Sequence, residues 1–225
     1  MKKYSLIIAL LLSANNSLAA AYDEFYGRAE VGMGFFDKNA SASNDKKLKN
    51  SKALIGSIAL GTNIQPNLRV ELMASNTTNA IAKSDGKTSV TGFNNSSEKQ
   101  KLRRQSLMLR ILPDFYDFGY GKLYGIGGIG ISKISNSASI VLTDAAGANR
   151  SEFSKVNPKY VPSFTLGGGA GFFLNENFML DVSYYYLHSG VTKSKELNIN
   201  GKQIQTGKMK INSHNIGLGL RIIFN

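Results

Sequence analysis

The residues of this chain that could do chemistry are its two histidines, His188 and His214, each of which has a serine beside it. Ser189 and Ser213 make these candidate Ser–His pairs for acyl transfer, in which the imidazole would activate the hydroxyl. Successive residues of a strand face opposite ways, so neither pair forms a dyad on a common face if these segments are strands. The absence of cysteine excludes thiolate nucleophiles, thiolate metal ligands and disulfides. We therefore predict no catalytic residue, no metal site, no cofactor and no enzymatic activity.

Charged residues set into apolar stretches are the second candidate chemistry, because they could either conduct ions or pair with one another. They alternate with apolar residues, most clearly in the segment Leu68-Arg69-Val70-Glu71-Leu72. The whole set comprises Arg28, Glu30, Arg69, Glu71, Arg104, Arg110, Asp181 and Arg221. The role of these side chains depends on the elements that carry them.

The last stretch of the chain, residues 213–224, alternates strictly and predicts a β-strand. One face carries His214, Ile216, Leu218, Leu220, Ile222 and Phe224, and the other carries Asn215, Gly217, Gly219 and Arg221. A tall apolar face and a small polar face suit a strand with lipid outside and a narrow packed lumen inside. We take Leu220, Ile222 and Phe224 as the signal for the barrel-assembly machinery.

Seven earlier stretches show the same two-residue period, which predicts seven further strands, at residues 25–35, 53–62, 68–75, 104–111, 122–132, 164–172 and 180–186. The stretch 122–132 is so rich in glycine that its two faces cannot be assigned. The connections alternate between long and short along the chain. Turn signals within the long ones are Asp85-Gly86, Gly147-Ala148-Asn149 and Asn200-Gly201.

These features predict an all-β fold, an eight-stranded antiparallel transmembrane up-and-down barrel with short periplasmic turns and long extracellular hairpin loops. Aromatic residues gather at the short-turn end, as a membrane-interface girdle should, at Phe25, Tyr26, Phe115, Tyr116, Phe118, Phe172, Phe178 and Phe224. A secreted soluble sandwich or a lipocalin-like barrel has the same period and is the alternative.

Export is indicated at the start of the chain. Lys2 and Lys3 precede an apolar segment from Tyr4 to Leu12, and small residues follow at Ala19 to Ala21. This is the pattern of a secretory signal peptide. We expect residues 1–21 to be the signal peptide and residues 22–225 to be a barrel domain in the bacterial outer membrane.

The eight charged side chains of this set would face the lumen of the predicted barrel. The interior of an eight-stranded barrel is just wide enough for side chains to fill it. Charges held this close in a low dielectric persist when they are paired. We therefore favour a network of ion pairs that plugs the lumen over a conductive pathway.

The predicted loops are basic in a chain of net charge +12. Their candidate interaction residues are Lys46, Lys47, Lys49, Lys99, Lys101, Lys193, Lys195 and Lys202. Basic loops favour polyanions, either lipopolysaccharide phosphates on the cell's own surface or sulfated glycans and acidic patches on a host. No nucleic-acid partner is predicted.

The overall plan resembles the eight-stranded outer membrane proteins A and X. Several motifs are similar to those of the small surface adhesins of rickettsiae, namely Asn67-Leu68-Arg69, Asn200-Gly201-Lys202, residues 207–210, Ser213-His214-Asn215 and Gly219-Leu220-Arg221. This resemblance implies adhesion to host cells and capture of a host serum protein such as vitronectin. The alternatives are a structural outer-membrane barrel or small porin without a host ligand and, less favoured, an enzyme that modifies lipid A.

Overall fold

The computed structural model describes residues 25–37, 51–87, 93–144, 149–155, 157–193, 197–199, 202–204 and 208–224. The predicted signal peptide lies outside these ranges. Among the described residues, no helix is long and apolar enough to cross a membrane. The strands are β1 (Phe25–Phe36), β2 (Ser51–Gln65), β3 (Leu68–Thr77), β4 (Ala80–Lys87), β5 (Phe93–Asp117), β6 (Gly121–Asp144), β7 (Asn149–Lys155), β8 (Lys159–Phe173), β9 (Phe178–Lys193), β10 (Leu197–Ile199), β11 (Lys202–Ile204) and β12 (Lys208–Phe224).

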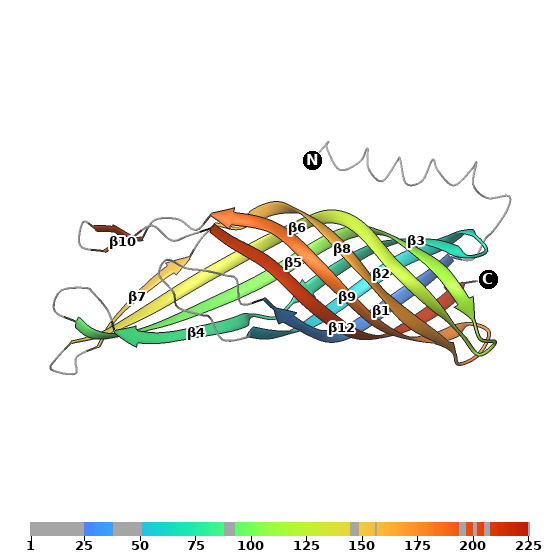
Figure 1. The fold of residues 1–225 in the computed structure, drawn as a ribbon, viewed down its shortest axis with the longest axis horizontal. Coiled ribbons are helices and arrows are strands. Elements are labelled where there is room, and N and C mark those ends of the chain that lie inside the picture. The colour runs from blue at the N-terminus through green and yellow to red at the C-terminus, as the bar shows by residue number, and fades with distance from the viewer. Residues whose placement is uncertain are drawn as a thin grey trace.

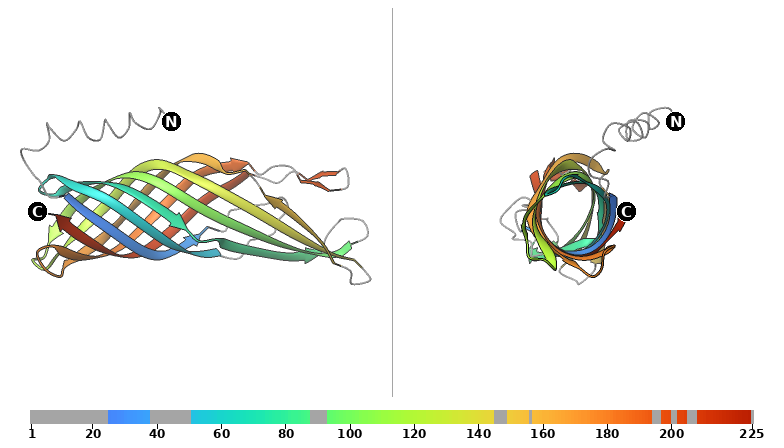
Figure 2. Two further views of the ribbon diagram at one scale, coloured as in Figure 1. Left: turned by 180° about the vertical axis from the view of Figure 1, so that it is seen from behind. Right: turned by 90° about the vertical axis from the view of Figure 1, so that its right-hand side faces the viewer.

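Eight of these strands close into one antiparallel barrel, in the order β1, β2, β3, β5, β6, β8, β9 and β12, with β12 pairing back to β1. Figure 1 shows the strands winding obliquely along the barrel, and the end view in Figure 2 shows the closed ring. Closure leaves no free strand edge in the ring of eight, which is what a barrel surrounded by lipid would require, because an unpaired peptide group is costly there. The predicted fold class is confirmed.

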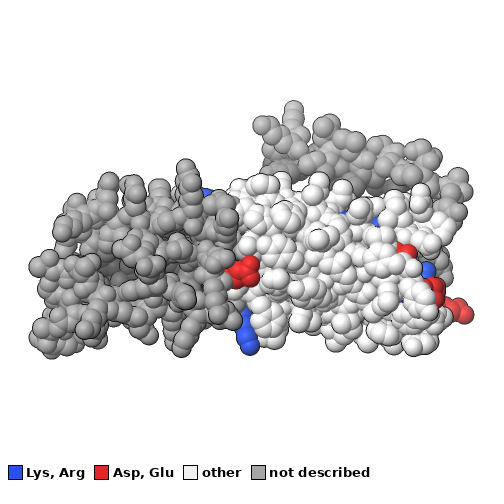
Figure 3. Space-filling view, in the orientation of Figure 1, with Lys and Arg blue, Asp and Glu red and all other residues white. Residues whose placement is uncertain are grey.

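The side chains of the barrel strands alternate between an exposed outer wall and a buried lumen. On β3 the outward Leu72 is 40% exposed, while the inward Glu71 and Met73 are almost fully buried. The same register assigns the faces of β6, which its sequence left open, because Tyr124 is buried and Ile129 is 70% exposed. On the face that Figure 3 shows, the described outer wall between the two rims carries few charged side chains.

Short turns join the barrel strands at one rim, at residues 66–67, 118–120 and 174–177. The same rim carries both ends of the closed sheet, where Phe25 pairs with Phe224. Exposed aromatic rings such as Phe115 and Tyr116 gather there, as predicted. The prediction that Tyr26 belongs to this aromatic girdle is wrong. Its ring is only 3% exposed and lies in the lumen, because Tyr26 occupies the same face of β1 as Arg28.

At the opposite rim the strands continue past the barrel as hairpins. β5 has 25 residues and β6 has 24, more than twice the roughly 10 that a tilted strand needs to span a bilayer. β4 pairs with the start of β5, and β7 pairs with the end of β6. Together they form a four-stranded ribbon with β4 and β7 at its edges, which projects from the barrel in Figure 1.

The ribbon corrects two sequence predictions. Asp85 and Gly86 do not form a turn, because they lie within β4 and pair with Ser97 and Ser96 of β5. Residues 133–162, expected to be loop, are mostly strand in β6 and β7, because pairing continues beyond the apolar part of the sequence. The signal at Gly147-Ala148 lies outside the described residues, and Asn149 begins β7.

The two strands of the hairpin predicted around Asn200-Gly201 are present. β10 pairs antiparallel with β11, with Leu197 opposite Ile204 and Ile199 opposite Lys202. The two residues between these strands lie outside the described ranges.

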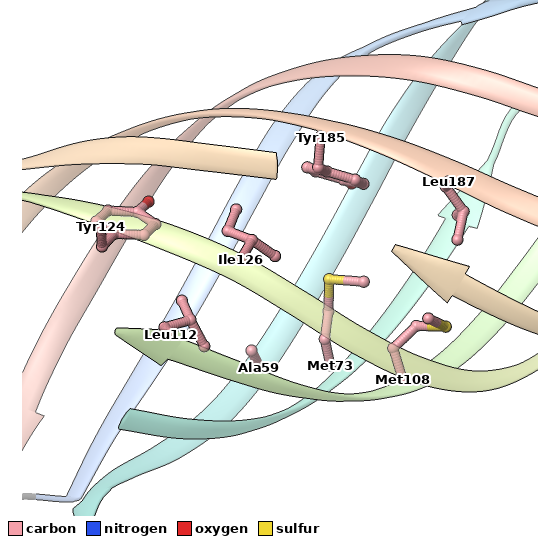
Figure 4. Packing of buried hydrophobic residues seen from close by; sticks show 8 residues of the cluster. All are labelled: Ala59, Met73, Met108, Leu112, Tyr124, Ile126, Tyr185 and Leu187. Carbon is pink, nitrogen blue, oxygen red and sulfur yellow. The ribbon is translucent and has the colours of Figure 1, made fainter. Parts of the chain in front are cut away.

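Apolar side chains pack the lumen in two groups. A central group, shown in Figure 4, consists of Ala59, Met73, Met108, Leu112, Tyr124, Ile126, Tyr185 and Leu187. A second group lies toward the hairpin rim and consists of Phe36, Ala53, Ala80, Leu102, Ile134, Val161 and Ile211. The polar side chains of the candidate site are buried in the same lumen.

Candidate functional site

Glu71 is the hub of the charged network in the lumen. Its Oε2 accepts hydrogen bonds from Nη2 of Arg110 and, at 3.3 Å, from Nη2 of Arg28. The hydroxyl of Tyr26 donates to Oε1 of Glu71 at 3.1 Å. A fully buried carboxylate is stable only when such partners compensate its lost hydration.

Glu30 extends this network across the barrel. Its Oε2 lies 3.4 Å from Nη1 of Arg28 and accepts a hydrogen bond of 2.9 Å from the hydroxyl of Ser183 on β9. Gly217 makes room for it, because a Cβ there would lie 2.5 Å from Cδ of Glu30. The network therefore joins β1, β3, β5 and β9 through the lumen.

Arg221 and Asp181 form a second, bidentate pair. Nε of Arg221 lies 3.0 Å from Oδ2 of Asp181, and Nη2 lies 2.5 Å from Oδ1. The guanidinium also lies over the rings of Tyr26 and Tyr124, at 5.1 and 5.8 Å from their centroids. Planar bidentate contact and aromatic faces are the environment that suits a buried arginine.

Arg69 pairs with a carboxylate that the sequence analysis missed. Its Nη2 lies 2.6 Å from Oδ1 of Asp114, and its guanidinium lies 4.7 Å from the centroid of the Tyr124 ring. Asp114 lies in the short connection between the predicted strands 104–111 and 122–132. Asp114 lies four residues after the inward-facing Arg110 on the same strand, so the two-residue period of a strand was the available signal.

Arg104 is the exception among these arginines. In the described part of the chain it contacts no carboxylate. Its Nη2 donates to the hydroxyl of Ser213 at 2.8 Å, and its guanidinium lies 5.1 Å from the centroid of the Phe36 ring. Its Nη1 finds no hydrogen-bond partner among the described residues.

Buried serines occupy the same half of the lumen as Arg104. The hydroxyl of Ser132 lies 2.8 Å from that of Ser106, and it is contacted by the hydroxyls of Ser163 at 2.7 Å and Ser189 at 3.3 Å. Small hydroxyl side chains from four strands thus satisfy one another where the charged network ends.

The structure places all eight charged candidates in the lumen, each no more than 5% exposed: Arg28, Glu30, Arg69, Glu71, Arg104, Arg110, Asp181 and Arg221. It does not pair neighbours on one face of β3, since Arg69 and Glu71 have different partners. Seven of the eight are joined to a carboxylate or guanidinium by ion pairs. This arrangement holds the strands together across the lumen.

The candidate loop lysines are only partly described. Lys99 and Lys101 lie on β5, Lys193 ends β9 and Lys202 begins β11, while Lys46, Lys47, Lys49 and Lys195 lie outside the described residues. The described strands that carry them belong to the hairpin side of the barrel. The C-terminal residues Leu220, Ile222 and Phe224 face outward on β12.

The two histidines lie on the outer wall near the hairpin rim, away from their neighbouring serines. Nδ1 of His214 lies 2.7 Å from the hydroxyl of Tyr184, and its Nε2 lies 3.7 Å from Oδ1 of Asp37. Ser213 is buried in the lumen behind it. Among the described residues, neither imidazole is hydrogen-bonded to a serine, so no Ser–His dyad is assembled there.

The sequence from residue 7 to residue 224 matches the family model described as the outer membrane protein beta-barrel domain. The chain belongs to this family of outer membrane β-barrels. The apolar part of the outer wall is therefore its lipid-facing belt in the bacterial outer membrane, with the short turns on the periplasmic side and the hairpins outside.

Relatives of this outer membrane β-barrel occur in rickettsiae. A protein of Rickettsia prowazekii (strain Madrid E), named as a candidate adhesin, is 28% identical over 227 residues, covering 98% of this chain and 99% of the relative. A candidate adhesin of Rickettsia bellii (strain OSU 85-389) is also 28% identical, over 229 residues and with the same coverage.

Two solved structures share the fold. Neisserial surface protein A superposes with a TM-score of 0.54 at 17% identity, covering 89% of this chain and 97% of its own. The outer membrane protein OprG of Pseudomonas aeruginosa superposes with a TM-score of 0.58 at 14% identity, covering 90% of this chain and 96% of its own. At these identities the likeness concerns the barrel alone.

Proposed function

We propose that this outer membrane β-barrel is a surface adhesin, whose extracellular hairpins bind host cells or a host serum protein of the vitronectin kind. The observation that carries the proposal is the four-stranded ribbon of β4, β5, β6 and β7. It extends well beyond the length that membrane crossing requires. Binding residues are often carried by projecting segments on a rigid scaffold.

The packed lumen supports an anchoring role for the barrel. Glu71, Asp181 and Asp114 each contact an arginine in the interior, and two groups of buried apolar side chains also fill the lumen. Because the lumen is filled, the hairpins are the parts of the protein that would contact molecules outside the cell. The rickettsial relatives, named as candidate adhesins, favour the same function.

The ribbon also offers a mode of recognition. Within the described sheet, β4 and β7 are edge strands, so each would offer one row of backbone groups to an added strand. Backbone hydrogen bonds would supply affinity, and the lysines of the hairpins would attract an acidic partner. The lysines would also contact lipopolysaccharide of the cell's own surface.

The test is to shorten the ribbon without changing the barrel. Lys83 pairs with Lys99, and Ile140 pairs with Glu152, so residues 84–98 and 141–151 can each be replaced by an Asn-Gly turn that keeps the register below. We expect the doubly shortened protein to lose binding to host cells and to vitronectin-coated beads. Glu176→Gln, in an exposed short turn on the periplasmic side, is the control and should bind normally.

Single-channel conductance of the intact protein completes the test. Binding that survives removal of every hairpin would contradict the adhesin function, and steady conductance would favour a porin instead.

A further inference from the structure

A shallow groove crosses the outer wall between two rows of cross-strand neighbours. One row runs through Val31, Gly56, Asn76, Gln105 and Lys133, each of which is the register partner of the next. The parallel row includes Ile58, Ala74, Leu107 and Ile131. Residues of both rows line the same cavity. Because barrel strands tilt, such rows climb the wall.

The lower part of the groove is apolar and hollow. Gly56 has open space where a side chain would be, with no atom within 4 Å of the position that a Cβ would take. Its neighbours Val31 and Ile58 are 69% and 67% exposed and stand on either side of it. Ala74, the partner of Ile58 on β3, is also small. A hydrocarbon chain fits such a depression in the lipid-facing wall.

The upper end of the groove is cationic. Lys133 stands opposite Gln105, and Arg103 stands opposite Ser135, two residues farther along β6, so Arg103 and Lys133 are diagonal neighbours on the outer face. Nε of Arg103 donates to Oδ1 of Asn76 at 3.1 Å, which orients the guanidinium. Nζ of Lys133 lies 5.9 Å from the centroid of the Tyr160 ring.

These cations have no acidic neighbour in the described wall. Lys101, opposite Ser137, adds a third cation next to Arg103. The described outward neighbours of the three are uncharged, namely Asn76, Gln105, Ser135, Ser137 and Tyr160. Like charges on adjacent positions of a sheet repel one another, and an anion seated among them would remove that cost.

We propose that this groove binds one phosphorylated lipid of the outer leaflet. Its phosphate contacts Lys101, Arg103 and Lys133, and one acyl chain lies along the groove over Gly56 and Ala74. The site is distinct from the general lipid belt because it lies on one arc of the barrel.

The experiment uses native mass spectrometry of the detergent-purified full-length barrel with diphosphoryl lipid A, and with the dephosphorylated lipid of identical acyl chains. Because Arg103→Gln with Lys133→Gln removes two of the three cations that would contact the phosphate, it should weaken binding of the diphosphoryl lipid about tenfold or more. The charge-preserving pair Arg103→Lys with Lys133→Arg should keep most of the binding. Lys52→Gln, an exposed cation on β2 outside the groove, should have little effect.

The acyl chain is tested separately. Gly56→Leu should fill the groove and weaken lipid binding. Gly127→Leu, on the outer wall of β6, is the control: it lies outside the groove and should leave lipid binding unchanged. A Cβ at Gly127 meets only ordinary contacts with Ile111, so this variant should fold. Heat-dependent gel migration shows that each variant is folded. The proposal is overturned if the dephosphorylated lipid binds equally well or if the double glutamine variant binds like the parent. It is also overturned if inorganic phosphate competes while Gly56→Leu has no effect, which would indicate a phosphate site without a lipid chain.

Discussion

Glu71 and Arg110 stand directly opposite each other on β3 and β5, and their side chains meet in a fully buried ion pair. Because the two Cα atoms are register partners, the pair reports directly on the alignment of these strands. Arg28 approaches the same carboxylate oxygen from β1. The Glu71 carboxylate therefore contacts two guanidinium groups. It is the carboxylate partner of Arg110, and it shares Arg28 with Glu30.

Replacement of Glu71 tests the importance of this hub. We expect Glu71→Leu to lower the free energy of unfolding by about 3–5 kcal/mol, because it leaves Arg110 buried without a carboxylate and removes one of the two carboxylates that contact Arg28. The measurement is urea unfolding in lipid vesicles followed by tyrosine fluorescence. Asp117→Leu, whose side chain is 59% exposed at the periplasmic rim, is the control and should change stability little. Equal unfolding midpoints for both variants would contradict a structural role for the network.

Arg104 should respond differently from Arg110. Arg104→Met removes a buried cation that has no described carboxylate partner, and it should leave stability unchanged or raise it. Arg110→Met removes a partner of Glu71 and should destabilise the barrel by a few kcal/mol. The same unfolding assay compares the two. A larger loss for Arg104→Met would show that its contacts with Ser213 and Phe36 matter more than the charge balance.

The basic hairpins should confer salt-dependent adhesion. Replacing Lys46, Lys47 and Lys49, or Lys193, Lys195 and Lys202, with serine should reduce host-cell binding without unfolding the barrel. Binding by the parent protein should also weaken as salt rises, since the Debye length falls from about 8 Å at physiological ionic strength to about 3 Å at 1 M. A cell-binding assay across a salt series measures both effects. Adhesion that is insensitive to salt and to these substitutions would exclude an electrostatic contribution.

The closed barrel should resist detergent at room temperature. We expect the unheated protein to migrate faster than the heated protein on detergent gels, because the paired ring of eight strands stays compact until it is melted. Solubility of the folded chain in aqueous extracts without detergent would contradict the membrane assignment.

The sequence by itself determined where the eight barrel strands lie and which way most of their side chains face. A strand has a period of two, so strict alternation in stretches such as residues 68–75 assigns Arg69 and Glu71 to the lumen without any tertiary information. The same reasoning could not assign β6, because glycine contributes no polarity to either face. It also placed Asp114 in a connection. Had the strand been extended to Asp117, the two-residue period would have assigned Asp114 to the lumen together with Arg110.

Only the tertiary structure decided the register between strands, and with it the ion-pair partners. Glu71 and Arg110 are 39 residues apart, and Arg221 and Asp181 are 40 apart, so no local spacing links them. The extent of the hairpins was decided in the same way, since Asp85 and Gly86 join β4 because β5 continues beside them. Alternation specifies a face, whereas pairing depends on how two ladders slide past each other, and a shift of two residues preserves the face and changes every partner.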